Sequence, residues 1–433
     1  MLDIKLVREK PDIIRQDLEK RGASEKMQLL EHVITWDEEW RAELKLVEDL
    51  RRKRNELTKE VANLKKAGQD VKAKVEEAAR LPLEIEKAEK EVDALKEKIT
   101  RGLMRLPNIL HESVPIGASD ADNVEVKTWG EPKVPPFELM PHGEFMEHLG
   151  VADFERARKV AGAGFFYLKG PLALMDIAIV QFAFDYLVKK GYTPVLPPYM
   201  LRRGPYEGVV DLGDFESMMY KIEGEDMYLI ATSEHPIGAM YQGEIIDEDL
   251  LPMKFAGYST CFRKEIGAHG VDTKGLFRIH QFNKVEQFVF CRPEDSWKFH
   301  EELLSNAEAL FQQLGIPYRV VNVCTGDIGT IAAKKYDIEA WFPRTKSYGE
   351  VVSCSNCTDY QARRLNIRCG KVGGEKRFLH TLNSTAIATS RALRAIFENY
   401  QRADGSLEVP PVLRDYMGGL ERIEPEGSVR AKK

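Results

Sequence analysis

The stretch Cys261–Phe290, CFRKEIGAHGVDTKGLFRIHQFNKVEQFVF, contains two apolar runs separated by a polar segment with three glycines. This pattern predicts a long hairpin of two antiparallel strands. Alternate residues of a strand lie on the same face. We therefore expect one face of the second strand to carry Arg278, His280, Phe282, Lys284 and Glu286.

The side chains of this hairpin suit a flat, anionic ligand with a polar end group. Arg263 and Glu265 share a side at the end of the first strand. Guanidinium groups bind phosphate oxygens in a bidentate manner, and a ring such as Phe282 can stack on a base. Phe282 and Glu286 are about 13 Å apart along a strand, roughly the distance from the base of an adenylate to the group on its phosphate. An edge hairpin whose charges face solvent would show the same pattern.

The sequences FRKE and RIHQF in this stretch resemble motif 2 of class II aminoacyl-tRNA synthetases, and in detail the seryl-tRNA synthetase branch of that family. The resemblance implies an α+β fold with two parts. Residues 1–108 would form an antiparallel helical hairpin, a coiled-coil arm that binds tRNA. Residues 109–433 would form a catalytic domain with an antiparallel sheet flanked by helices.

Composition allows this organisation. With 433 residues the chain has room for two domains, and its net charge of −6 means that any contact with nucleic acid needs a local basic patch. The N-terminus, MLDIKLVREK, has no secretory signal pattern. Apolar stretches such as Ile177–Phe184 are shorter than the ~18 residues of a membrane span. We expect a cytoplasmic protein without a membrane segment.

The cysteine spacing does not predict a metal centre. Cys354 and Cys357 form a CxxC pair, and Cys369 could add a third thiolate, but no second pair follows to complete a tetrahedral site. We expect reduced, partly buried thiols and no structural zinc.

The first hundred residues show heptad spacing. Val47 and Leu57 belong to apolar series between residues 36 and 64, and the spacing resumes after residues 67–70 with Ile85 and Ile99. Such narrow apolar seams predict two antiparallel helices that pack on each other. Residues 51–74 contain nine basic and three acidic residues, which suits a phosphate backbone, although a solvated coiled-coil face is the alternative. By resemblance the arm grips the long variable arm of tRNA, and its binding residues are Arg51, Arg52, Arg54, Lys65, Lys66 and Lys72.

Residues 106–141 contain several prolines and predict a linker or irregular structure. Beyond them, strand patterns occur in hairpin-like runs, without βαβ spacing and without a common Gly-rich phosphate loop. Residues 172–190 predict an apolar helix, followed by a strand that ends in prolines. This segment resembles motif 1, with Pro198 as its proline, which implies a homodimer interface. A buried core helix would be equally apolar.

Three further segments match the family in order. Thr232, Ser233 and Glu234 resemble its TxE element, which holds the serine ammonium group, although the triplet also reads as a helix N-cap. Residues 348–357 offer Glu350 and Ser353, hard oxygen ligands that suit Mg²⁺ brought by ATP; a polar pair at a strand end is the alternative. Residues 380–401 resemble motif 3, with Arg391 on the γ-phosphate.

The resemblance also assigns the residues of each subsite, with Arg263 and Arg391 as the catalytic residues. Binding of ATP is assigned to Arg263, Lys264, Glu265, Arg278, Ile279, Phe282, Glu350, Val351, Val352, Ser353 and Arg391. Binding of serine is assigned to Thr232, Ser233, Glu234, Arg263, Glu286, Asn383 and Thr385. Glu286 would read the serine hydroxyl, and Mg²⁺ would bind Glu350 and Ser353 together with ATP.

The implied function is ATP-dependent ligation of L-serine to tRNA(Ser) through a seryl-adenylate, and also to tRNA(Sec) where it is present. Two alternatives remain open. The chain could be a class II paralogue that activates another small amino acid for a carrier protein, or an inactive scaffold that docks proteins through its coiled coil. The convergence of several charged side chains, Arg263, Glu286 and Arg391 among them, argues against a scaffold.

Overall fold

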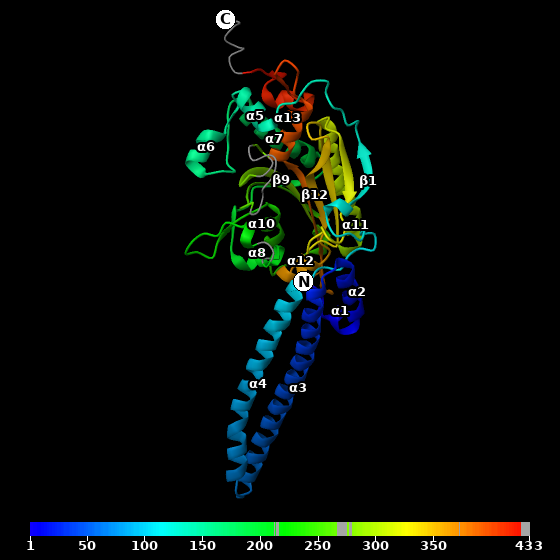
Figure 1. Cartoon of the computed structure of the whole chain (residues 1–433). Coiled ribbons are helices and arrows are strands. Elements are labelled where there is room, and N and C mark those ends of the chain that lie inside the picture. The colour runs from blue at the N-terminus through cyan, green and yellow to red at the C-terminus, as the bar shows by residue number, and fades with distance from the viewer. Residues whose placement is uncertain (212, 214–215, 266–274, 277–278, 372, 426–433) are drawn as a thin grey trace. The chain divides into compact units, whose positions relative to one another are not determined.

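The computed structural model describes residues 1–211, 213, 216–265, 275–276, 279–371 and 373–425 (Figure 1). The chain divides into two compact units, Met1–Ile109 and Leu110–Lys433. The described part of the first unit is helical. The second unit combines a large sheet with helices on both of its faces.

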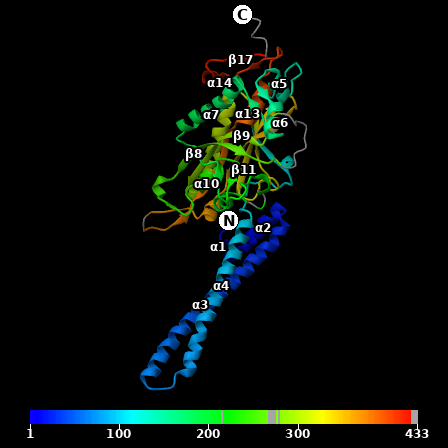
Figure 2. The ribbon, with the colours of Figure 1, turned by 90° about the vertical axis from the view of Figure 1, so that its left-hand side faces the viewer.

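The first unit is a helical hairpin with two short helices before it. Its helices are α1 (Ile4–Glu9), α2 (Pro11–Arg21), α3 (Ser24–Lys66) and α4 (Lys72–Arg105). The long helices α3 and α4 lie side by side (Figures 1 and 2), which confirms the predicted coiled-coil arm. The seam buries apolar side chains at heptad spacing: Val47, Leu57, Leu81, Ile85, Ala88, Leu95 and Ile99.

Two close contacts hold α1, α3 and α4 together. Gly102 of α4 lies so close to α3 that a Cβ atom there would be 2.4 Å from Cγ2 of Val33. Asp37 of α3 is 2% exposed, and its carboxylate pairs with Arg8 of α1 at 2.6 Å and with Arg41 at 3.0 Å. The two guanidinium partners compensate the buried Asp37 carboxylate for its loss of water. Because Arg8 belongs to α1, its ion pair with Asp37 holds α1 on α3.

The second unit is built on an eight-stranded sheet in the order β1-β10-β11-β12-β15-β9-β8-β4. Every neighbouring pair is antiparallel except β4 and β8, which confirms the predicted sheet type. The strands are β1 (Val124–Trp129), β4 (Thr193–Val195), β8 (Met253–Phe262), β9 (Gln281–Cys291), β10 (Tyr318–Asn322), β11 (Lys334–Phe342), β12 (Ser347–Asn356) and β15 (His380–Ala388). The pair β8 and β9 is the hairpin predicted from Cys261–Phe290.

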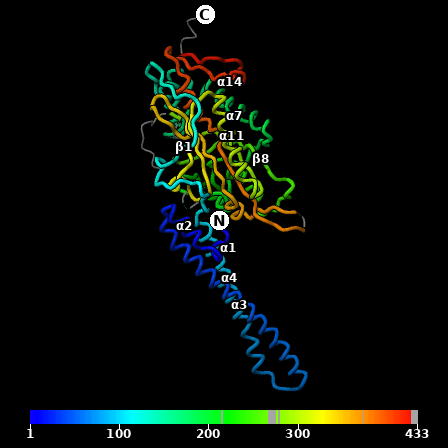
Figure 3. The backbone as a smooth tube through the Cα atoms, turned by 90° about the vertical axis from the view of Figure 1, so that its right-hand side faces the viewer, coloured from blue at the N-terminus to red at the C-terminus, as the bar shows by residue number. Residues whose placement is uncertain are grey.

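Strand β1 corrects one expectation. Residues 106–141 were predicted as linker or irregular structure, but β1 lies within them and pairs with β10 at an edge of the sheet (Figure 3). All six residues of β1 are exposed. Its sequence, VEVKTW, alternates apolar and polar residues over only four positions, and none of its side chains is buried, so this short pattern does not stand out among the flanking prolines.

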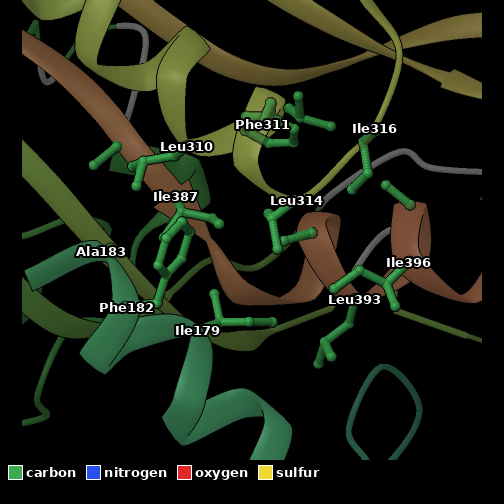
Figure 4. Close-up of a cluster of buried hydrophobic side chains, with 14 of the residues drawn as sticks. Ile179, Phe182, Ala183, Leu310, Phe311, Leu314, Ile316, Ile387, Leu393 and Ile396 are labelled. Atoms are coloured by element: carbon green, nitrogen blue, oxygen red, sulfur yellow. The ribbon is translucent and has the colours of Figure 1, made fainter. Parts of the chain in front are cut away.

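The sheet separates an apolar core from a polar side. On one face pack α7 (Pro171–Lys189), α11 (Ser296–Gln313) and α13 (Thr389–Asn399). Figure 4 shows Ile179 and Phe182 of α7 in the same cluster as Phe311 of α11, Ile387 of β15 and Leu393 of α13. On the other face lie α8 (Arg203–Val209), α10 (Glu234–Ala239) and α12 (Tyr360–Leu365), which surround Phe288 and Phe290 of β9.

The remaining elements are short and border these layers. The helices are α5 (His142–His148), α6 (Phe154–Ala161) and α14 (Pro411–Arg414), with 3-10 turns at Asp120–Asp122, Glu216–Met218, Glu248–Leu250, Pro293–Asp295 and Asp415–Met417. The small sheets pair β2 (Ala152–Asp153) with β3 (Tyr167–Leu168), β5 (Met200–Leu201) with β6 (Tyr228–Leu229), β16 (Leu407–Glu408) with β17 (Arg422–Ile423), and β13 (Arg368–Cys369) with β7 (Ile245–Ile246) and β14 (Arg377–Phe378).

Helix α7 is, within the described ranges, the one helix that is long and apolar enough to cross a membrane. This likeness concerns length and composition only, and about 44% of the helix is buried inside the unit. Its buried side chains, Met175 and Phe182 among them, belong to the main core. A core helix of this kind meets the same criteria, so α7 gives only weak evidence for a membrane segment.

Candidate active site

The polar side of the sheet contains a cavity of about 470 Å³. Its floor is formed by residues of β9, β15, β12 and β11, and its walls by the start of α10 and residues 327–332. Eleven predicted site residues line it: Thr232, Glu234, Arg263, Phe282, Glu286, Glu350, Val351, Ser353, Asn383, Thr385 and Arg391. Arg263 and Arg391, which are far apart in the sequence, therefore meet at one cavity.

Strand alternation places β9 in this floor as the sequence predicts. Phe282, Lys284 and Glu286 all line the cavity, whereas Val285 and Val289 of the same strand belong to the apolar core. Glu286 pairs with Thr385 of the neighbouring β15. One strand thus supplies side chains to both the core and the site.

Two bulges bring further residues to the cavity face. In β12 the register shifts so that Ser353 pairs with Asp337 of β11 and Glu350 pairs with Glu339. Residues three apart would point to opposite faces of a regular strand, but the extra residue at this bulge puts both Glu350 and Ser353 on the cavity. A shift in β15 likewise keeps Thr385 and Ala388 on the cavity face.

A buried ion pair lies in the floor. Nζ of Lys284 is 2.5 Å from Oε2 of Glu286, and the two side chains are 7% and 2% exposed. The Thr385 hydroxyl donates to the same Oε2 at 3.4 Å. Burial raises the pKa of Glu286, while the positive charges of Lys284 and Arg263 oppose this rise.

Glu234 completes an acidic corner at the start of α10. Gln361 of α12 donates from Nε2 to Oε1 of Glu234 at 3.4 Å and accepts from the Thr381 hydroxyl at 2.7 Å. Burial, and then the nearby charge of Glu286, raise the pKa of Glu234 to about 7. A cation beside this carboxylate would stabilise its charged form, which burial and the neighbouring Glu286 disfavour. The corner therefore suits an ammonium group.

Arg263 follows the end of β8 and lies beside Phe282. Its guanidinium carbon is 5.4 Å from the centre of the Phe282 ring. The Nε atom of Arg263 is buried and has no hydrogen-bond partner among the described residues. A half-buried guanidinium whose buried Nε donor is unused is suited to an anion that enters the cavity.

Arg391, near the start of α13, forms an ion pair with Glu350. Its Nη1 is 2.9 Å from Oε1 of Glu350 and donates to the Glu350 carbonyl at 2.9 Å. The Glu350 side chain is 46% exposed. Glu350 and Ser353 offer two hard oxygen ligands on the open cavity, a sparse set that fits Mg²⁺ when phosphate oxygens and water complete its coordination.

Other predicted site residues lie away from the cavity lining. Val352 points to the opposite face and is 1% exposed in the core, and Ile279 is also buried. Ser233 is fully buried, and its hydroxyl donates to the Gly257 carbonyl at 2.9 Å; it occupies the N-cap position of α10 without a side-chain capping bond. Lys264 lies 5.7 Å from the centre of the Tyr220 ring.

Two predicted ATP-binding residues, Glu265 and Arg278, belong to the segment between β8 and β9. Glu265 is the last residue described before residues 266–274, and its φ of 44° is unusual for a residue other than glycine. Arg278, predicted to bind an outer phosphate, lies outside the described residues.

The sequence assignment missed several residues of the cavity. The sequence predicted Lys284 on the same face as Phe282 and Glu286 but gave it no role. Lys335 and Cys357 also line the cavity, and neither was assigned to it. Asn383 donates from Nδ2 to Sγ of Cys357 at 3.6 Å. The alternation of β9 could have identified Lys284. For Lys335 and Cys357, only the pairing of β11, β12 and β15 brings them to the site.

The cysteines remain separate thiols. All six are buried, and none is in a disulfide bond. Burial raises the pKa of Cys357 well above the usual thiol value. Among the residues described, no three His, Cys, Asp or Glu side chains are grouped as a metal site.

The basic residues near the turn of the arm differ in their pairing. Arg51 pairs with Glu89 at 2.6 Å and Arg52 pairs with Asp49 at 2.8 Å. Four other predicted residues are exposed and form no ion pair with any residue that the structure describes: Arg54, Lys65, Lys66 and Lys72. Their charges are therefore free to meet an anionic partner.

Comparison with known proteins agrees with this architecture. Residues 1–110 match the model of the seryl-tRNA synthetase N-terminal domain, and residues 218–400 match the tRNA synthetase class II core domain (G, H, P, S and T). A serine–tRNA ligase from Methanocella arvoryzae is 62% identical, and the alignment covers 98% of this chain and 100% of that protein. The chain belongs to the seryl-tRNA synthetase family. It is a class II aminoacyl-tRNA synthetase, an enzyme that ligates serine to tRNA.

Solved structures of seryl-tRNA synthetases share the whole fold. The crystal structure of seryl-tRNA synthetase from Pyrococcus horikoshii complexed with ATP is similar with a TM-score of 0.95 and 48% identity, covering 98% of this chain and 100% of that one. The cytoplasmic serine–tRNA ligase from Naegleria fowleri in complex with AMP gives a TM-score of 0.90 and 38% identity, covering 99% of each chain.

The ion pair in the floor of this synthetase yields a prediction about stability. Replacing Lys284 by Met leaves the buried Glu286 carboxylate without its cation, so at pH 8 we expect a loss of about 3–5 kcal/mol in the free energy of unfolding. In this variant the pKa of Glu286 in the folded state is further above its unfolded value. The folded state then binds more protons, and the stability of the variant falls as pH rises.

Urea unfolding at pH 6 and pH 8 measures this effect, with Glu286→Gln added in a double variant. The double variant should regain most of the stability and lose the additional pH dependence. Lys159→Met, which removes the cation of an exposed pair, is the matched control and should change stability by less than about 1 kcal/mol. A Lys284→Met variant as stable as the wild type at pH 8 would show that the pair does not support the floor.

Proposed function

We propose that the chain activates L-serine with ATP to form seryl-adenylate and pyrophosphate, and then transfers the seryl group to the 3′-terminal adenosine of tRNA(Ser). The observation that carries the proposal is that Glu234, Glu286, Arg263 and Arg391 all line one cavity. A cavity that contains both carboxylates and guanidinium groups matches a small zwitterionic amino acid joined to a nucleotide phosphate.

The acidic corner supports a serine subsite. Glu234, with Thr232 beside it, would accept from the serine ammonium group. Glu286 would accept from the serine hydroxyl, and Asn383 and Thr385 of β15 would close the pocket around the small side chain. A buried acceptor that alanine leaves unpaired discriminates strongly against alanine, whereas exclusion of threonine depends on sterics worth ~1–3 kcal/mol.

The guanidinium groups support the nucleotide end. We assign Arg263 to the α-phosphate and the serine carboxylate, and Phe282 to stacking on the base. Glu265 would accept from the adenine amino group, and Arg391 with Arg278 would bind the outer phosphates. Glu350 pairs with Arg391 in the structure, so an ATP phosphate would compete with Glu350 for this guanidinium.

Glu350 and Ser353 would hold Mg²⁺ together with the phosphates of ATP. When bound, this ion supplies charge neutralisation of the phosphate oxygens. The chain's own residues position the reactants. A serine carboxylate oxygen attacks the α-phosphorus, the bond to the bridging oxygen of pyrophosphate breaks, and Arg263 and Arg391 stabilise the charge that moves to the phosphates. The adenosine hydroxyl then displaces AMP from the seryl carbonyl.

The arm and α7 support the proposed partners. The unpaired basic residues Arg54, Lys65, Lys66 and Lys72 suit the phosphate backbone of tRNA(Ser), and of tRNA(Sec) where it is present. Helix α7 exposes Leu174 and Ile177, which are 54% and 61% accessible, and this apolar surface favours a homodimer interface. Membership of the seryl-tRNA synthetase family supports a cytoplasmic location.

The paralogue and scaffold alternatives have weaker support. A paralogue that serves a carrier protein would need no basic arm near the turn, and five cations there form no ion pair with any residue that the structure describes: Arg54, Lys59, Lys65, Lys66 and Lys72. An inactive scaffold would gain nothing from a buried lysine and carboxylate in an open cavity.

Serine-dependent exchange between ATP and pyrophosphate tests the proposal directly. Across the small amino acids, only serine should support strong exchange. Glu286→Ala should lose at least about 100-fold of serine-dependent exchange, because the variant removes a buried acceptor for the substrate hydroxyl. Equilibrium binding of ATP should be retained.

Glu308→Ala is the control, since Glu308 is a buried carboxylate that pairs with Lys127 away from the cavity. It should keep its exchange activity when folded. Undiminished exchange in Glu286→Ala would remove Glu286 from serine recognition, and exchange with another amino acid in place of serine would refute the proposed substrate.

The arm gives an independent prediction for tRNA. Replacing Arg54, Lys65 and Lys66 by Ala should raise the KM for tRNA(Ser) about tenfold or more at physiological salt and make it less salt-dependent, because fewer phosphate charges are neutralised. Exchange of pyrophosphate should not change. The matched control replaces Glu38, Glu39 and Glu43, acidic residues of the same helix, by Ala. If aminoacylation by the Arg54, Lys65 and Lys66 variant equals the wild type at every salt concentration, these residues do not bind tRNA.

A further inference from the structure

A lysine of β11 faces the cavity and has no place in the assignments above. Lys335 lines the cavity, and its side chain is 18% exposed. It pairs with Ser355 of β12, which pairs with Asn383 of β15, so the three residues form a row across the cavity face. The pairing of the strands therefore directs Lys335 to the same side as the residues proposed to bind substrate.

The ammonium group of Lys335 has unused hydrogen-bonding capacity. Its Nζ donates to the carbonyl of Asp327 at 3.2 Å. The Oδ2 atom of Asp337 is 3.7 Å away, which is an ion pair but too long for a hydrogen bond. An ammonium group has three N–H donors, so among the described residues Lys335 keeps two of them for another acceptor.

Lys335 also belongs to the part of the cavity that contains Glu350. Asp337, two residues further along β11 and so on the same face as Lys335, pairs with Ser353 of β12. Glu350 and Arg391 line the same cavity as Lys335. Lys335 and Arg391 therefore reach one cavity from β11 and from α13. The triphosphate group of ATP, bound near Glu350, would lie between the ammonium group of Lys335 and the guanidinium group of Arg391.

We propose that Lys335 is a further substrate-binding residue of the enzyme, whose ammonium group binds the β- or γ-phosphate of ATP and then the pyrophosphate product. The proposal deepens the function proposed above and rests on it. Lysine acts as a compact point charge, which suits phosphate oxygens whose position changes when pyrophosphate forms. Lys335 and Arg391 together would neutralise the outer phosphates from two sides.

The competing explanation is structural. Asp337 is 5% exposed, and Lys335 could serve only to compensate its charge. The two roles differ in what they predict for ligands that lack the outer phosphates. A phosphate-binding Lys335 affects ATP but not AMP, whereas a structural Lys335 affects both ligands or neither.

The experiment measures equilibrium binding of ATP and of AMP, both in the presence of Mg²⁺, to the full-length enzyme. Lys335→Met should weaken ATP binding about tenfold or more, the range expected for loss of a charge-assisted hydrogen bond, and should leave AMP binding within twofold. The KM for pyrophosphate in the exchange reaction should rise in the same variant, while the KM for serine stays near the wild-type value. Lys335→Arg should restore most of the ATP affinity.

Two further variants separate the explanations. Lys334→Met is the matched control, because the neighbouring lysine lies 4.5 Å from the Tyr336 ring and is not part of the cavity lining; it should bind both nucleotides normally. Lys335→Met combined with Asp337→Asn removes the uncompensated carboxylate and should still bind ATP weakly. Recovery of ATP binding in this double variant, or equal weakening of ATP and AMP in the single variant, would overturn the proposal. Wild-type enzyme without serine-dependent exchange would instead refute the proposed function, whatever the binding results.

Discussion

The central constraint on this molecule is the burial of opposite charges in the floor of a sheet. Lys284 and Glu286 are almost fully enclosed, and their 2.5 Å ion pair lies on the strand that also supplies Val285 and Val289 to the core. Buried charges are tolerated only when neighbours compensate them. The surrounding strands and helices must therefore bring Thr385 and Arg263 to the same place, and an open cavity for a charged ligand results.

The sheet uses irregularities as well as alternation to build this site. The bulges in β12 and β15 let residues three apart, Glu350 with Ser353 and Thr385 with Ala388, reach the same face. A bulge adds one residue and changes the face of everything beyond it. Without the shift in β12, the carboxylate of Glu350 would point to the apolar core, where an uncompensated charge costs on the order of several kcal/mol. The two bulges are therefore needed to bring these side chains to the site.

Much of this architecture follows from sequence pattern, and the failures have physical reasons. Heptad spacing predicted the arm, and alternation predicted Phe282 and Glu286 in the site. Val352 was assigned to ATP by resemblance, and its side chain lies in the apolar core, so spacing gave no support to this assignment, which stays a prediction. Strand β1 was missed because it is short, lies among prolines and buries no face. Lys335 was missed because strand pairing, which the sequence does not state, decides what meets across a sheet.

Binding of serine should change the ionisation of the half-buried Glu234 carboxylate. The pKa of Glu234 is about 7 in the free cavity, and an ammonium partner should lower it, so serine should displace a proton. Isothermal titration calorimetry of L-serine at pH 6.5, in buffers of different ionisation enthalpy, measures the number of protons released. We expect clear proton release at pH 6.5 that falls towards zero at pH 8.5 and is absent in Glu234→Gln. Serine binding without any proton release at pH 6.5 would contradict the account.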